Sequence, residues 1–347
     1  MTDSHTLDPI AYKKSLSRMG WSMLVFIGLS FLFTLVSETC DPALVDPRRW
    51  GETPALVIKA LCAVLSAVCY MAPFFLAGVF YYVLSRRTVT RQLDLRIRLP
   101  REFPLLILAG LAILSAGAVI NAAFCDIIGY SMPTGTPTPA DYNDPATVIL
   151  YMTVALAPAF AEEFLFRGVI YRNLRPFGRA QAVVISALMF ALMHQNIAQL
   201  FYTFLAGIAL ALMYELTGSI WCSVFFHMFN NQLSVLREVL YYGSFGETAV
   251  PYINVFDTVL FVLGVVSLVI LMLYYTRQAR ARKASATEGR RIFGCHAEIT
   301  EEADTPMSTA TVFRSLINPG IITFVSVVYV TMGLLWLLFF IANLGVS

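Results

Sequence analysis

Two adjacent glutamates stand inside an apolar stretch, in the segment ALAPAFAEEFLFRGVIYRN. Glu163 and Arg167 are four residues apart, so both lie on one face of a helix, and the spacing predicts a structural ion pair. Glu162 lies about 100° around the helix from Glu163 and has no partner nearby in the sequence. A carboxylate without a positive partner in a low-dielectric setting can take up and release a proton near neutral pH. Glu162 is therefore the candidate general base.

Histidines and asparagines occur in two further apolar segments. The motif FALMH ends at His194, and the motif HMFNN begins at His227 and contains Asn231 four residues later, on the same helix face. Neutral His and Asn donors can hold a developing oxyanion in a dry site. Ionisable groups at membrane depth are costly to insert and mark functional sites. Three helices that each offer such a group predict one shared site.

Other chemistries are less well supported by the residues. A Glu/His cluster could bind zinc, but the H-E-x-x-H pattern is absent, so we expect no metal and no other cofactor. The six cysteines show no C-x-x-C spacing. Cys40 and Cys125 are both expected near the outer ends of helices, where a disulfide could persist, and their pairing stays open. No basic tract with interleaved aromatic residues indicates nucleic-acid binding.

Membrane helices are the elements that must position these groups. Hydrophobic residues make up 58% of the 347 and charged residues only 13%, against about 45–50% and 25% in soluble domains. The composition predicts an all-α polytopic membrane protein, since the apolar runs lack the alternation of a barrel. Nine runs are predicted to span the membrane: Met19–Val36, Pro54–Leu84, Phe103–Ile128, Ala146–Ile170, Ala180–Met193, Ala198–Glu215, Ser219–Leu240, Val255–Tyr275 and Pro319–Leu344. The fifth run is short for a span, and whether it continues through His194 into the sixth stays open.

The distribution of basic residues predicts the orientation of the spans. Of the 24 Lys and Arg residues, 20 lie in the N-terminal tail, after the second span, at the end of the fourth span and after the eighth span. Cytoplasmic loops carry an excess of Lys and Arg. The pattern places the N-terminus in the cytoplasm and the C-terminus outside, with the first run retained as a span. We expect three parts: helices one to three in 1–145, the catalytic core of helices four to seven in 146–240, and helices eight and nine with a polar cytoplasmic loop (276–318) in 241–347.

The motifs EEFLFR, FALMH and HMFNN, in this order on consecutive membrane helices, resemble the CAAX-protease and bacteriocin-processing family (CPBP, or Abi). The resemblance covers about Ala146 to Leu240. It implies an intramembrane glutamic-type endopeptidase in which Glu162 and His194 activate a water molecule. It further implies that His227 and Asn231 bind the tetrahedral oxyanion.

The partners implied by the resemblance are a peptide or protein substrate, with or without a lipid group, and the lipid bilayer. The resemblance also implies the plasma membrane of a bacterium. Two alternatives remain open: a non-catalytic immunity or scaffold protein built on the same fold, and a transporter that uses Glu162 for proton coupling. Against a transporter, the sequence has no pair of Gly- or Pro-broken helices in related halves.

Overall fold

The computed structural model describes residues 8–38, 47–86, 96–129, 155–243, 245–284 and 308–344. Every regular element in these ranges is a helix and none is a strand, so the predicted all-α fold class is confirmed. In lipid, a helix satisfies its own backbone hydrogen bonds, which is why long apolar runs adopt this structure. Cys40, one half of the disulfide left open above, lies outside the described residues.

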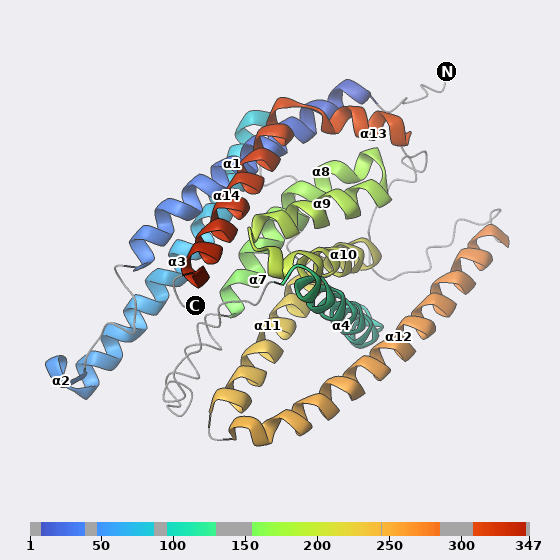
Figure 1. The fold of residues 1–347 in the computed structure, drawn as a ribbon. Coiled ribbons are helices and arrows are strands. Elements are labelled where there is room, and N and C mark those ends of the chain that lie inside the picture. Colours follow the sequence, from blue (N-terminus) through green and yellow to red (C-terminus); the bar gives the residue numbers. More distant parts are fainter. Residues whose placement is uncertain are drawn as a thin grey trace.

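Three long helices form one flank of the molecule (Figure 1). They are α1 (Pro9–Glu38), α3 (Glu52–Ser85), which follows the single turn α2 (Pro47–Trp50), and α14 (Pro319–Leu344). Helix α1 contacts both α3 and α14, although α14 comes from the other end of the chain. The short helix α13 (Thr309–Leu316) precedes α14 and also contacts α1.

The centre of the molecule holds the segments that carry the three motifs. They are α7 (Leu156–Glu163), the π-helix η3 (Phe164–Tyr171), α9 (Arg179–Met193), α10 (Leu200–Thr217) and α11 (Ile220–Tyr242). The short connections are α8 (Arg172–Leu174), η4 (Arg175–Phe177), η5 (Ile197–Gln199) and η6 (Gly246–Ala249). Because the α7–η3 segment contacts α3, α9 and α11, the two glutamates lie where several helices meet.

Helices α4 (Phe103–Ile127) and α12 (Val250–Ala284) complete the fold on the opposite flank (Figure 1). Helix α4 packs between α10 and α12. The polar segment 276–318 was predicted as a loop, but both of its ends are helical. Helix α12 continues to Ala284, and α13 begins at Thr309. Residues 285–307 lie outside the described part of the chain.

Five described helices, α1, α3, α4, α10 and α12, are long and apolar enough to span a membrane. A sixth span results if α13 and α14, which meet at an angle of 68°, are counted as one. The predicted seventh span, α11, is not among these five, and it carries the polar residues of the HMFNN motif and the charged residues that follow it. The multispan character is therefore supported, while the count of nine spans and the sidedness of the termini stay predictions.

The fifth run does not continue through His194 into the sixth as one helix. Helix α9 ends at Met193, and Gln195 adopts a left-handed backbone conformation with φ of 48°. Such a conformation is unfavourable for a residue with a Cβ and cannot continue a right-handed helix. The Asn196 side chain then accepts a hydrogen bond from the Ala198 N–H, which starts the next helical segment. His194 consequently lies at a break between two helices.

Helices α1 and α14 cross at two glycines, and this contact leads to a stability prediction. A Cβ at Gly20 would lie 2.2 Å from the carbonyl carbon of Gly320, so Gly20→Ala forces the helices apart and is expected to destabilise the protein by about 1–3 kcal/mol. A Cβ at Gly28, on the same helix, would meet no atom of the described residues within 4 Å, so Gly28→Ala is the matched control. It should be neutral or stabilising by up to about 1 kcal/mol. Thermal unfolding of the purified full chain in detergent measures both, and equal effects would contradict the assigned crossing.

Candidate active site

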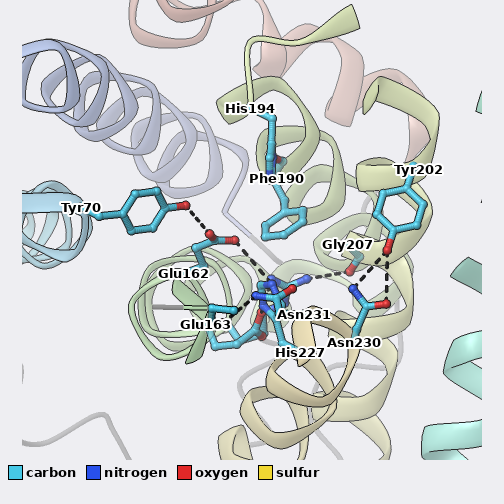
Figure 2. Close-up of polar contacts among 12 residues, drawn as sticks. Tyr70, Glu162, Glu163, Phe190, His194, Tyr202, Gly207, His227, Asn230 and Asn231 are labelled. Carbon is cyan, nitrogen blue, oxygen red and sulfur yellow. Dashed lines mark hydrogen bonds and ion pairs between the residues drawn. The ribbon is translucent and has the colours of Figure 1, made fainter. Parts of the chain in front are cut away.

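Glu162 is held by a tyrosine from another helix. The Tyr70 hydroxyl, on α3, donates a hydrogen bond of 2.6 Å to Glu162 Oε1 (Figure 2). The Glu162 side chain is buried, and its second oxygen, Oε2, has no hydrogen-bond partner among the described residues. Oε2 lies 3.8 Å from His227 Nε2. The tyrosine therefore binds one carboxylate oxygen, Oε1, while the other oxygen, Oε2, faces His227.

Glu163 and Arg167 form the ion pair that their spacing predicted. Arg167 Nη1 lies 2.9 Å from Glu163 Oε1, and both side chains are fully buried. The second terminal nitrogen, Nη2, donates to the Gly207 carbonyl of α10 at 2.9 Å, and the guanidinium carbon lies 4.9 Å from the centre of the Phe190 ring. Arg167 thus joins η3 to α10 through a hydrogen bond and to α9 through a cation–π contact, in addition to its ion pair with α7.

His227 links the two glutamates. Its Nδ1 lies 3.1 Å from Glu163 Oε1, and its Nε2 faces Glu162 Oε2 (Figure 2). A carboxylate only accepts hydrogen bonds, so the geometry favours a proton on Nδ1 when Glu163 is ionised. Glu163 therefore does more than neutralise Arg167, because it also orients the imidazole.

His194 lies apart from this cluster, on the other side of the Phe190 ring (Figure 2). Its Nδ1 is 2.8 Å from the Phe190 carbonyl oxygen, and the two rings are 5.0 Å apart. A carbonyl oxygen can only accept, so Nδ1 carries a proton and the neutral ring keeps its lone pair on Nε2. Within the described part of the chain, no hydrogen bond or ion pair joins His194 to Glu162.

The two asparagines of the HMFNN motif have separate partners. Asn231 Nδ2 donates to the Ala155 carbonyl, at the start of α7, at 3.1 Å. Asn230 pairs with the Tyr202 hydroxyl of α10, at 3.1–3.2 Å in both directions. Asn231 thereby ties α11 to the helix that carries the glutamates.

Two cavities reach the site from different sides. The first, about 500 Å³, lies between α4, α9, α10 and α11, and its polar wall includes His194, His227 and Asn231. The second, about 580 Å³, lies between α1, α3 and α7, and its wall includes Tyr70 and again His194. Glu162 stands between the two cavities. Its Oε2 lies 3.8 Å from His227 on the wall of the first cavity, and its Oε1 accepts a hydrogen bond from Tyr70 on the wall of the second.

The sequence identified most of the residues that meet here and missed the tyrosines. Glu162, Glu163, Arg167, His227 and Asn231 are brought together, and His194 lies on a wall shared by both cavities. Tyr70 and Tyr202 could not be recognised, because a tyrosine in an apolar run is common and its partner is set by helix packing. Among the described residues, no group of three or more His, Cys, Asp or Glu side chains is arranged to hold a metal ion.

Comparison with known proteins agrees with the motif assignment. Residues 144–233 match the family described as type II CAAX prenyl endopeptidase Rce1-like. No curated protein and no solved structure matches the chain. The match spans all three motifs, EEFLFR, FALMH and HMFNN, and every predicted site residue. The predicted resemblance to the CAAX-protease family is confirmed over residues 144–233, the segment that carries the site.

Proposed function

We propose that this chain is an intramembrane endopeptidase that hydrolyses a peptide bond with a water molecule activated by Glu162 and His194. The observation that carries the proposal is the buried Oε2 of Glu162, which lacks a hydrogen-bond partner among the described residues and faces His227 beside a cavity of about 500 Å³. An uncompensated carboxylate oxygen is costly to bury, so its retention next to a cavity points to work on a bound molecule.

The proposed reaction begins with the water. Glu162 takes one proton from the water molecule, and the other O–H of the water donates a hydrogen bond to the free Nε2 of His194. The resulting hydroxide adds to the peptide carbonyl carbon. The Tyr70 hydroxyl occupies Oε1 and so directs the basic Oε2 toward the substrate. When the tetrahedral species collapses, the C–N bond breaks and Glu162 returns its proton to the leaving nitrogen.

We propose that His227 and Asn231 donate hydrogen bonds to the oxyanion of the tetrahedral intermediate. This role requires a hydrogen on both ring nitrogens of His227, one donated from Nδ1 to Glu163 and one from Nε2 to the oxyanion. The Nε2–H then points away from Glu163 and is available to an anionic oxygen, and Asn231 lines the same cavity with its amide. Donors fixed in a dry site stabilise such a charge strongly.

The substrate that we propose is a peptide or a protein segment, with or without a lipid group, that reaches the site from the bilayer. Most of the wall of the first cavity is apolar, and the residues include Leu114, Ala118, Ala206 and Phe226. We further propose nine spans with a cytoplasmic N-terminus, on the apolar runs and the distribution of basic residues. The family resemblance supports the plasma membrane of a bacterium as the location.

Peptide hydrolysis by the purified full chain tests this function. Quenched fluorescent peptides that end in a cysteine motif, with and without a prenyl group on the cysteine, are incubated with the protein in detergent. Mass spectrometry then identifies the new amino and carboxyl termini. Cleavage at a single bond supports the proposal, and failure to cleave any peptide by a folded protein argues for a non-catalytic role.

Loss of the Tyr70 hydroxyl tests how Glu162 is positioned. Tyr70→Phe keeps the ring and removes one charge-assisted hydrogen bond, so we expect kcat to fall about 10- to 100-fold at unchanged folding. KM should change little, because the tyrosine contacts the glutamate and not the peptide. Tyr329→Phe, at an exposed position on α14, is the matched control. A Tyr70→Phe variant with full activity would show that this hydrogen bond has no part in catalysis.

A further inference from the structure

A basic cavity of about 540 Å³ lies away from the candidate active site, where α1, α3 and α8 meet. Lys14 and Arg18 of α1 and Arg172 of α8 line it. Its wall also carries hydroxyl groups, among them Ser85, whose Oγ is buried without a hydrogen-bond partner in the described part of the chain. The cavity thus offers three cations and a hydroxyl group that can bind a ligand.

A second basic cavity, about 600 Å³, adjoins the first between the start of α1 and the α13–α14 corner. Lys13, Lys14 and Arg314 line it, so Lys14 belongs to both cavities. Three segments that are distant in sequence, α1, α8 and α13, therefore bring five basic side chains to one end of the molecule, around the beginning of α1 (Figure 1).

These cations have no counter-charge among the described residues. No described Asp or Glu lines either cavity. Two arginines elsewhere in the described ranges have carboxylate partners: Arg175 pairs with Glu215 at 2.7 Å, and Arg237 with Asp257 at 2.6 Å. By contrast, no ion pair within the described residues involves any of the five: Lys13, Lys14, Arg18, Arg172 and Arg314. Cations gathered around a cavity repel one another and favour an anion, and guanidinium groups fit phosphate oxygens in pairs.

The depth of the five cations indicates a lipid as the source of that anion. Lys13, Lys14 and Arg18 precede the apolar run that begins at Met19, Arg172 follows the run that ends near Ile170, and Arg314 precedes the run that begins at Pro319. The ends of apolar spans lie at the level of the lipid headgroups.

Exposed apolar side chains accompany the charges. Ile10 on the wall of the second cavity is 65% exposed, as is Phe313, the neighbour of Arg314 on α13. Helix α13 turns by 68° away from α14 and carries both a basic and a large apolar side chain at its surface, which is typical of a helix that lies in the membrane interface. A ligand with a phosphate and acyl chains satisfies both features, whereas a free phosphate satisfies only one.

We propose that the two adjoining cavities around Lys14 bind the phosphate-bearing headgroup of an anionic phospholipid. The site is separate from the catalytic cluster and does not depend on the proposed peptidase activity. Its ligand ties α1, α3, α8 and α13 together, because each of these helices contributes a wall residue.

Lipid binding by the full chain tests the proposal. Native mass spectrometry from a neutral detergent measures the Kd for phosphatidylglycerol and for phosphatidylcholine with the same acyl chains. The variant Lys14→Gln/Arg18→Gln/Arg172→Gln should weaken phosphatidylglycerol binding about 100-fold, since each basic residue near an anionic lipid contributes about fivefold. Arg48→Gln/Arg49→Gln/Lys59→Gln removes the same charge in α2 and the first turns of α3 and should leave the Kd nearly unchanged.

Three results would overturn the proposal. They are equal binding of the two lipids by the wild type, an unchanged Kd in the cavity variant, and thermal stabilisation by inorganic phosphate alone that equals the effect of phosphatidylglycerol. The last result would identify a free anion as the ligand. If the triple variant does not elute as a folded protein, the single change Lys14→Gln at an exposed side chain is used, with an expected loss of about fivefold.

Discussion

Replacement of Glu162 by Gln is expected to lower kcat for peptide hydrolysis by about 10³-fold, within the range that general acid–base catalysis supplies. Gln keeps an oxygen that accepts from Tyr70 but replaces the basic Oε2 with an amide nitrogen that cannot take a proton from water. Binding of the peptide should persist, because the cavity walls are unchanged. The measurement is steady-state hydrolysis of the best quenched peptide, together with peptide affinity by fluorescence anisotropy.

The matched control for this prediction is Glu247→Gln. Glu247 is an exposed residue of η6, so the same chemical change there should leave kcat unchanged. Full turnover by a folded Glu162→Gln protein would remove Glu162 from the mechanism. Loss of binding with loss of turnover would instead assign it a role in holding the peptide.

Replacement of Arg167 by Met is expected to destabilise the protein by about 3–5 kcal/mol, which is the cost of leaving a buried charge unpaired. The change leaves the carboxylate of Glu163 without its cation, and the Gly207 carbonyl without its donor. Both side chains of the pair are fully buried, so water cannot replace the lost contacts. Thermal unfolding in detergent and the yield of folded protein measure the effect.

Two further variants separate the charge effect from the loss of packing. Glu163→Gln/Arg167→Met removes both charges and should be more stable than Arg167→Met alone by about 2 kcal/mol. Arg237→Met breaks the half-exposed pair with Asp257 and should cost no more than about 1 kcal/mol. Equal stability of Arg167→Met and the wild type would contradict the buried ion pair.

The stability of the Arg167 cluster and the activity of the site are connected through His227. Glu163 receives Arg167 on the same oxygen, Oε1, that contacts His227 Nδ1. A change at Arg167 that leaves the protein folded should therefore still disturb the imidazole that we assign to the oxyanion. The pair that looks structural in sequence thus positions a group of the proposed mechanism.

Periodicity and composition predicted the helices, because a long apolar run in lipid can satisfy its backbone only as a helix. They also predicted the ion pair of Glu163 and Arg167, since a spacing of four residues depends on the local geometry alone. The π-helix η3, which begins directly after Glu163, was not predicted, because no residue type specifies such a turn.

The sequence by itself determined that Glu162, His194, His227 and Asn231 are polar groups within apolar segments. Only the tertiary structure decided how they meet. Tyr70 approaches Glu162 across 92 positions of sequence, and the ring of Phe190 separates His194 from His227 (Figure 2). Contacts of this kind depend on how the side chains of several helices fill the space between them, and that packing is a property of the assembled bundle, which no local spacing encodes.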